Sequence, residues 1–519
     1  MASQLQPVEF PAGLYLNGSE YQRKGRWQIG QMVRWRNKLA TPIGGWKKVA
    51  MLLAGTPVSV LVGALRAMLT YRDNTQNRWM AAGSSQKLYT FDGGTFYDVT
   101  PVGFTTGNEN SSLGLGYGAG LYGDGTYGTV RSGAGIALEP AYWSLDTFGE
   151  YLVACANCDG RLYQWPPNTG AATVITNAPT KCRSLIVTNE RFLFALGAES
   201  PPGTANPRNV AWCSQEDITD WTPTLVNTAG SIILDTPGII FKGTRFQGDV
   251  LIFTDQDVHR SQFLGPPLVY GFKRVGTACG AIGPNAVVQS TDIVAWMSQN
   301  GFFYYDGYVK VLPCDVSDFV FNDINKDQQQ KVCCGINSTF NEFWWWYPSG
   351  TNTECDKYII WNYVDNWWST GTLSRSAWAD SQVWPNPMAS LPIVNEDGTT
   401  SAVVYAHEQG YLDDDTTRPV QLKSGPIEIG NGDQLAVVDR VFQDTGGVLG
   451  VATVTFGFRN APNVAETIKG PYTLDATRGY TDVRAQGRQM TFEIDQVADQ
   501  DQYWHIGTFR VSMQAGSRR

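Results

Sequence analysis

Ile293-Val-Ala-Trp-Met297 is a short apolar run, and after a polar turn it is followed by the aromatic run Gly301-Phe-Phe-Tyr-Tyr-Asp-Gly307. Short runs of β-branched and aromatic residues separated by turn residues are typical of paired β-strands. The pattern recurs from Arg72 to about Tyr411, with further instances at Gln86–Gly94, Gly160–Trp165, Val210–Trp212, Val250–Asp255, Tyr358–Trp361 with Trp367-Trp368, and Val403–Leu412. Units of roughly 50 residues with a few short strands each predict the blades of a β-propeller.

Composition supports an all-β protein. The 519 residues are 42% hydrophobic and only 17% charged, and 55 of them are glycine. The length predicts two or more packing units. The net charge of −9 argues against a body that grips nucleic acid through basic side chains. Residues 1–10 have neither a basic start nor an apolar core, and the nine scattered cysteines suit a reducing compartment, so we expect a protein assembled in a cytoplasm without membrane insertion.

A glycine-rich insertion interrupts the first blade, at about residues 104–140. Between Gly114 and Gly128 glycine alternates with Tyr117, Leu121, Tyr122 and Tyr127. Glycine permits close approach of the backbone, and the interleaved side chains can anchor the segment on another surface. We therefore expect Gly114, Tyr117, Leu121, Tyr122 and Tyr127 to form a channel-lining or inter-subunit loop.

The texture changes after Pro419, where strands of medium length alternate polar and apolar residues. Examples are Ala436–Phe442, Val451–Phe458, Gln489–Ile494 and His505–Val511. We expect residues 49–418 to form the propeller and 419–519 a β-sandwich-like platform domain. Residues 1–48 are expected to be an N-terminal arm that packs with the platform. Cationic side chains gather in the platform, among them Arg484, Arg488 and Arg510.

No constellation of residues predicts catalysis or a cofactor. Cys155-Ala-Asn-Cys158 is half of a zinc site without a second pair, so buried thiols are the favoured interpretation. Gly123–Gly128 matches a phosphate-loop pattern by letter, but no helix start follows it. Asp255, Asp257 and His259 could share a strand face, yet a hairpin turn with exposed carboxylates explains them as well.

Eight tryptophans lie between Trp344 and Trp384. Aromatic platforms stack on sugars, so a glycan-binding propeller is one interpretation. Packing between blades is the other, and we favour it because strands that are buried on both faces have this composition.

Several stretches resemble the tail nozzle proteins of short-tailed bacteriophages, also called tail hub or packaged-DNA-stabilisation proteins. They are Val33–Asn37, Pro42–Trp46, Gly114–Gly128, Trp212–Trp221, Gly265–Phe272, Asn300–Gly307 and Gly487–Arg519. The resemblance runs over most of the chain. It implies a distorted propeller around a DNA channel, a β platform that faces the adaptor ring, and no catalytic residues.

The resemblance further implies a structural virion protein of the tail that forms a ring, most simply a hexamer, as conduit and closure for the genome. The partners would be the tail adaptor protein, met through Arg484, Arg488 and Arg510, and possible tail fibre or spike proteins. Genome DNA would pass without specific binding along an acidic or neutral wall, for which Asp124, Glu139, Asp255 and Asp257 are candidates. The alternatives are a receptor- or glycan-binding propeller of a tail tip and a propeller hydrolase, for which no carboxylate pair stands out.

Overall fold

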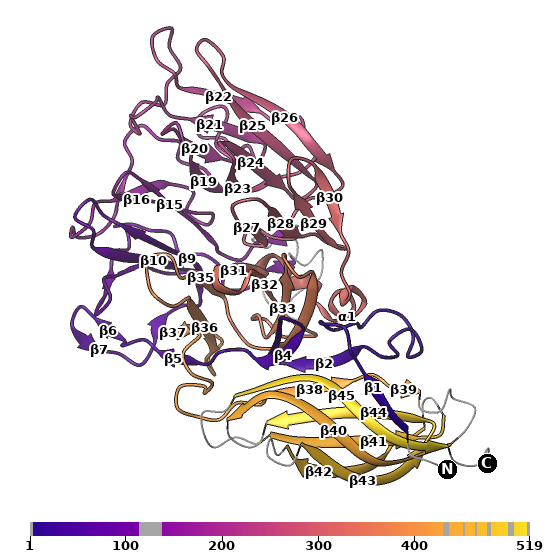
Figure 1. The fold of residues 1–519 in the computed structure, drawn as a ribbon. Helices are drawn as coiled ribbons and strands as arrows, with labels where there is room; N and C mark the ends of the chain where they lie inside the picture. The colour runs from indigo at the N-terminus through magenta and orange to yellow at the C-terminus, as the bar shows by residue number, and fades with distance from the viewer. Residues whose placement is uncertain are drawn as a thin grey trace, which may run out of the picture.

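The computed structural model describes residues 4–113, 137–428, 435–449, 452–461, 464–474, 479–496 and 503–515. Within them the chain is almost entirely β-structure, and Figure 1 shows two bodies, a large disc of sheets and a smaller layered body that holds both termini. The helical elements are α1 (Ser317–Asp323), η1 (Lys326–Lys331) and η2 (Ser338–Phe340). None of the helices in this described part has the length and apolar character of a membrane span.

The disc is a β-propeller whose blades are seven antiparallel sheets in the described ranges. Sheets one to three are β9 (Leu65–Arg72), β10 (Arg78–Ser84), β11 (Leu88–Phe91) and β12 (Phe96–Asp98); β15 (Trp143–Phe148), β16 (Tyr151–Ala156), β17 (Leu162–Trp165) and β18 (Thr173–Val174); and β19 (Ser184–Val187), β20 (Leu193–Leu196), β21 (Asn209–Trp212) and β22 (Gly230–Ile233). Sheets four and five are β23 (Ile240–Phe246), β24 (Asp249–Thr254), β25 (Asp257–Gly265) and β26 (Val269–Thr277), then β27 (Val287–Gln289), β28 (Val294–Met297), β29 (Phe302–Tyr305) and β30 (Val309–Leu312).

Sheet six is β31 (Cys333–Asn337), β32 (Glu342–Tyr347), β33 (Lys357–Asn362) and β34 (Trp367–Thr372). Sheet seven is β35 (Ala377–Ala379), β36 (Met388–Val394), β37 (Thr400–His407) and β5 (Trp46–Lys48), with β8 (Leu61–Val62) also on β37. Two short strands, β6 (Leu52–Leu53) and β7 (Thr56–Pro57), extend sheet one. The first strand of each sheet contacts the first strand of the next, and β35 contacts β9, so the ring is closed.

The ring closes with a strand from the start of the chain. β5 pairs with β37 as the outermost strand of sheet seven, with Trp46 opposite His407. This pairing ties the beginning of the propeller sequence to its end and supplies the hydrogen bonds that β37 would otherwise lack. Residues 46–48, expected in the N-terminal arm, therefore belong to the last blade.

The smaller body is a sandwich of two sheets. One has the order β3 (Val33–Arg36), β4 (Leu39–Pro42), β45 (Tyr503–Ala515), β40 (Ala436–Leu449) and β43 (Tyr480–Gly487), with β1 (Gln4–Val8) also on β45. The other has the order β2 (Trp27–Gln31), β38 (Gln421–Ser424), β44 (Gln489–Gln496), β41 (Ala452–Arg459) and β42 (Thr467–Thr473), with β39 (Ile427–Glu428) also on β44. Strands β1 to β4 are thus hydrogen-bonded into the C-terminal sheets.

Sandwich and propeller share one apolar core. β2 and β3 contact β34, the outer strand of sheet six. Trp35 of β3 packs edge-on against Trp367 of β34, with ring centroids 5.4 Å apart. Because a single buried cluster includes side chains of both bodies, they are packed as one unit.

Candidate functional site

The root of the glycine-rich insertion lies at one end of the propeller. It leaves β12 and returns to β15, so it sits at the end where the first strands of the sheets begin. Its two sides are held together by β13 (Ser112–Leu113) and β14 (Ala137–Leu138), which pair Leu113 with Ala137. Gly114, Tyr117, Leu121, Tyr122 and Tyr127, predicted to line a channel or contact a neighbour, lie outside the described residues.

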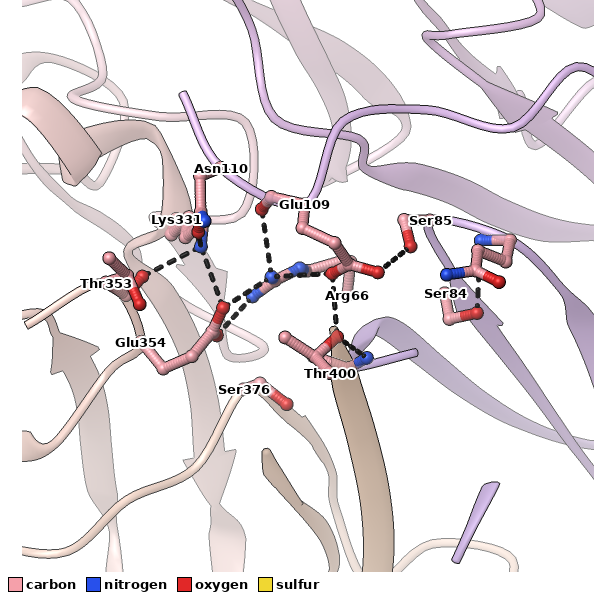
Figure 2. A network of polar contacts seen from close by, with 12 residues as sticks. Arg66, Ser84, Ser85, Glu109, Asn110, Lys331, Thr353, Glu354, Ser376 and Thr400 are labelled. Atoms are coloured by element: carbon pink, nitrogen blue, oxygen red, sulfur yellow. Dashed lines mark hydrogen bonds and ion pairs between the residues drawn. The ribbon is translucent and has the colours of Figure 1, made fainter. Parts of the chain in front are cut away.

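Glu109 fastens this root to two blades (Figure 2). Its carboxylate accepts hydrogen bonds from Thr400 Oγ1 of sheet seven, at 2.7 Å, and from the hydroxyl of Ser85 of sheet one. Its backbone carbonyl accepts a hydrogen bond from Arg66 Nη2 at 3.2 Å. Each bond to the carboxylate is charge-assisted, the stronger class of hydrogen bond.

Arg66, Glu354 and Lys331 form a buried ionic cluster under the root. Arg66 makes two parallel bonds to the Glu354 carboxylate, at 2.6 and 2.8 Å, and Lys331 Nζ lies 2.7 Å from the same carboxylate. Lys331 also donates to Asn110 Oδ1 at 2.6 Å, which brings the insertion into the cluster. Figure 2 shows these side chains converging from β9, from η1 and from the loop between β32 and β33.

The electrostatics of the cluster depend on each of its members. Burial opposes the charge of Arg66, but Glu354 and Glu109 outweigh it and raise the pKa of Arg66. Burial and the neighbouring Arg66 lower the pKa of Lys331 to about 8. Burial favours the neutral form of Glu354, but Arg66 and Lys331 overcome it and hold its pKa below the ordinary value. Buried charges are tolerated only when they are paired and hydrogen-bonded. Because Glu109 and Asn110 take part in this pairing, the cluster holds the root of the insertion in one position.

A further contact ties the root to η1. The Gln328 side chain accepts from the backbone N–H of Ser111 at 3.0 Å and donates to the Ser111 carbonyl at 2.8 Å. This pair of bonds copies a β-ladder and fixes the residues next to β13. The root is therefore held by sheets one and seven and by η1 before the chain enters the glycine-rich stretch.

The central cavity of the propeller opens beside this root. It has a volume of about 330 Å³ and is lined by the first strands of all seven sheets, Arg66 among them. At the end near the root, Asn285 Nδ2 donates to the Arg66 carbonyl at 2.7 Å. The cavity has the size of a small-molecule pocket. It cannot pass a DNA duplex, whose major groove alone is about 12 Å wide.

The three platform arginines proposed for docking differ in their exposure to solvent. Arg484 of β43 and Arg510 of β45 are exposed, and the alternation of burial along both strands places them on the outer face of the same sheet. Arg488 is half-buried in the turn to β44, where its backbone N–H donates to the Arg459 carbonyl at 3.0 Å. Arg484 also adopts a φ of 50°, a left-handed conformation beside the bulge in β40.

The sandwich is attached to the propeller through Arg34. This side chain is 2% exposed and its Nη2 lies 2.6 Å from Oε1 of Glu408 and 3.1 Å from Oε2 of Glu342. Its guanidinium carbon lies 3.6 Å from the centre of the Phe340 ring. Because Glu342 belongs to sheet six and Glu408 follows sheet seven, one arm residue binds the platform to two blades.

The tryptophan cluster is packing between blades. Trp344, Trp345 and Trp346 are each at most 2% exposed. Trp345 faces sheet five, where its ring lies 5.1 Å from Phe302, and Trp346 faces sheet seven, 5.2 Å from Trp378. Gly335 makes room for Trp378, since a Cβ there would lie 2.2 Å from that ring. Buried rings of this kind offer no surface to a sugar.

The candidate zinc and acid–base residues are also structural. Cys155 is fully buried, burial raises the pKa of its thiol, and burial raises that of Cys158 to about 11, so both stay protonated. Within the described ranges no group of three or more His, Cys, Asp or Glu side chains is placed to hold a metal ion.

One expectation about exposed carboxylates is wrong. Asp257 is 2% exposed; it accepts a hydrogen bond from Thr254 Oγ1 at 2.6 Å and lies 3.2 Å from His259 Nε2. Thr236 Oγ1 also donates to this carboxylate at 2.8 Å, and Arg274 Nε lies 3.5 Å from it, so Asp257 is enclosed by side chains of sheet four and of the segment that leads into it and does not belong to a channel wall. Glu139 pairs with Arg183 at 2.6 Å and Asp255 accepts from the Ile239 N–H at 2.7 Å, while Asp124 lies outside the described residues.

Sequence reasoning missed Arg34, Arg66, Glu342 and Glu354. The usable signal was a lone charge inside an apolar run, as Arg66 is within Leu61–Leu69 and Glu342 is before Phe343–Tyr347. Such charges are either paired or very costly. The partners come from remote parts of the chain, and no spacing in the sequence predicts them.

Comparison with known proteins adds little to this picture. No protein-family model matches the chain, and no curated protein matches it. Similar solved structures include an exported protein from Bacteroides fragilis, with a TM-score of 0.31 and 10% identity over 51% of this chain and 89% of that one. Another is YCF48 bound to D1 peptide, with a TM-score of 0.36 and 9% identity over 71% of this chain and 98% of that one. Likenesses this weak carry no argument about function.

Proposed function

We propose that this chain is the ring-forming tail nozzle protein of a short-tailed bacteriophage, a structural subunit that conducts and retains genome DNA beneath the adaptor ring. The proposal rests on the resemblance of the stretches from Val33 to Arg519. The structural observation that supports it best is the arm of residues 4–48, which is shared by both bodies. It supplies strands to both platform sheets and then closes the propeller through β5.

A shared arm gives the subunit the rigidity that a conduit wall needs. The buried Arg34 cluster and the continuous apolar core oppose hinge motion between platform and propeller, since opening would expose an unpaired charge. A ring of such subunits keeps its bore constant while DNA moves. Its contacts would be heterologous and closed, as cyclic symmetry requires.

The conduit would lie between subunits and not along the propeller axis. The central cavity of about 330 Å³ excludes a duplex. The resemblance implied a propeller around a DNA channel, and in this proposal that channel is the bore of the ring. The anchored insertion root is a suitable origin for a loop that reaches a neighbour or narrows the bore.

The alternative of a glycan-binding tail-tip propeller loses its main support. It depended on exposed tryptophans, and Trp344–Trp346 are buried between blades. No observation in the described residues favours that alternative over the nozzle.

Electron microscopy of assembled tails tests the proposal. We expect a closed ring of this chain below the adaptor, most simply six-fold, with the platform toward the adaptor. A single copy or a trimeric spike would contradict it. A gel-shift titration of the isolated protein at about 50 mM salt should show weak binding to duplex DNA, because a conduit wall that held phosphates would retard the DNA. Submicromolar affinity that falls steeply with salt would indicate a basic wall and would contradict this expectation.

A further inference from the structure

Two loops at one end of the propeller leave apolar side chains open to solvent. One joins β21 to β22 and carries Leu225 and Val226, which are both essentially fully exposed. The other is the end of the β25–β26 hairpin, where Leu264 is 53% exposed and Leu268 is 71% exposed. Figure 1 shows β22 and this hairpin at the top of the disc, away from the sandwich. We call these four side chains the apolar tip.

The bases of the two loops are packed together on Trp212. Its indole N–H donates to the carbonyl of Thr228, at the end of the first loop, at 2.9 Å. Its ring lies 5.8 Å from the ring of Phe272 and 5.7 Å from that of Tyr270, and both of these belong to β26. Tyr270 is paired with Phe263 across the hairpin. Both loops therefore project from one packed base that sheets three and four share.

Asn227 holds the first loop in a fixed turn. Its side-chain oxygen accepts a hydrogen bond from the backbone N–H of Thr224 at 2.8 Å. Its Nδ2 donates to the Thr222 carbonyl at 2.7 Å and to the Asp220 carboxylate at 2.9 Å. Hydrogen bonds made inside the turn lower the cost of moving its polar groups out of water. The turn thus presents the two apolar residues between Thr224 and Asn227 on a pre-formed support.

Neither loop carries a charged residue. The sequence has no Asp, Glu, Lys, Arg or His from 221 to 234 or from 261 to 272, although 17% of the whole chain is charged. Besides the apolar tip, the loops contain Pro223, Pro266 and Pro267, which are also exposed. Exposed apolar patches of this kind mark sites that contact proteins or membranes.

The side chains and the shape of the apolar tip favour a lipid surface over a protein. Binding between proteins depends on anchors such as Trp, Tyr and Arg, and Leu and Val are under-represented among them. Aliphatic side chains on projecting turns can enter a fluid hydrocarbon layer without a matching pocket, and the gain grows with the apolar area that is buried. The lack of charge removes the cost that an ionised side chain would add in that layer.

We propose that the apolar tip inserts into the interfacial layer of a lipid bilayer and anchors this end of the propeller there. The contact is shallow and does not cross the bilayer, because each loop offers only a few residues. Since the loops carry no cation, binding needs no anionic lipid. The inference goes beyond the nozzle role and does not depend on it: vesicle binding is measured on the isolated chain, whereas the nozzle role is tested on assembled tails.

Flotation of the full chain with phosphatidylcholine vesicles tests the proposal. We expect the protein to float with the vesicles, and its partition coefficient should change by less than about twofold between about 0.1 and 0.5 M salt, because no ion pair is screened. The tip variant, Leu225→Ser, Val226→Ser, Leu264→Ser and Leu268→Ser together, should lower the partition coefficient at least about tenfold, since most of the apolar area is lost.

The control variant makes the same chemical change elsewhere. It is Val102→Ser, Val311→Ser, Val364→Ser and Val394→Ser together, at positions between 54% and 88% exposed on other sheets or in the loops beside them. Its partition coefficient should equal that of the parent. The urea midpoints of both variants should match the parent's, because all eight side chains are exposed, and this separates lost binding from lost folding.

Two results would overturn the proposal on the vesicles themselves. A parent protein that does not float has no lipid contact, and equal flotation of the parent and the tip variant would place the contact elsewhere. Sedimentation without vesicles covers a contact between copies. If the parent self-associates, the tip variant does not, and neither floats, the apolar tip binds a second copy of this chain and the proposal is wrong.

Discussion

Arg34 Nε and Glu342 Oε1 lie 3.0 Å apart, and the two side chains are 2% and 1% exposed. One belongs to a strand of the platform sheet and the other to the sixth blade, 308 residues later. A charge pair this deeply buried contributes little net stability compared with apolar residues, but it is very costly to break. It therefore specifies one orientation of the platform on the propeller.

Arg34→Met should destabilise the protein by about 3–5 kcal/mol, because the buried Glu342 carboxylate and the partly buried Glu408 carboxylate are left without their cation. The urea midpoint of the isolated chain measures this. Arg36→Met, an exposed position on the same strand, is the matched control and should change stability by less than about 0.5 kcal/mol. Equal effects of the two substitutions would show that the pair does not hold the junction.

Stability should depend on pH through Glu342. Burial raises its pKa from 4.5 to about 7, despite the opposing charge of Arg34. Between these values the folded state binds a proton that the unfolded state has released. The contribution of this group is fully present below about pH 4.5 and is lost as pH rises through about 7.

Glu342→Gln should flatten that dependence, since glutamine does not titrate. Urea midpoints of the parent and the variant, measured from about pH 5 to 7.5, give the two slopes. Identical slopes would mean that Glu342 is ionised in the folded protein throughout this range.

Replacing residues 114–136 by Asn-Gly should leave the propeller intact, because Leu113 and Ala137 are already paired and a two-residue turn can join them. The cut spares Glu109 and Asn110, so the ionic cluster with Arg66 and Lys331 persists. Thermal unfolding should be unchanged, while tails carrying the variant should fail to assemble or should lose DNA. Stable, full and infectious particles would show that the insertion has no role in the ring.

The wider deletion of residues 108–136 is the informative comparison. It removes Glu109 and the contacts of Asn110 and Ser111 to η1, so it should destabilise the fold as well as the tail. If the 108–136 deletion lowers stability and the 114–136 replacement does not, residues 108–113 stabilise the fold and residues 114–136 act in the tail.

Reversing the charge of Arg484, Arg488 and Arg510 together should weaken docking to the adaptor at low salt, with little difference in ~1 M salt, where the Debye length is about 3 Å. Adaptor binding at two salt concentrations measures it. Reversal of the exposed propeller cations Arg72, Lys273 and Lys326 changes net charge equally and should not affect docking. Full docking of the platform variant at low salt would exclude this face.

Local features were predictable because they depend on neighbours in the sequence. The strand pairs around Trp296 and Phe303 follow from alternating apolar runs and polar turns, and β28 and β29 pair these two residues directly. The Trp344–Trp346 run indicated a strand buried on both faces, which is how the sixth blade uses it. The all-β class follows from the same signals, whereas the expectation that the glycine-rich insertion interrupts the first blade is wrong, because the insertion lies between sheets one and two.

The amino-acid order by itself therefore determined the strands, their turns and the apolar faces that must be covered, since these depend on side chains two to ten residues apart. Closure of the ring by Trp46–Lys48, burial of Asp257, and the pairing of Arg34 with Glu342 and of Arg66 with Glu354 were decided only by the tertiary structure. The three pairings join segments that are far apart in the sequence, and no periodic pattern links such segments. The burial of Asp257 depends on the side chains that surround it in the folded protein. A charged residue in an apolar run shows that a partner is needed, and the folded chain alone shows which one.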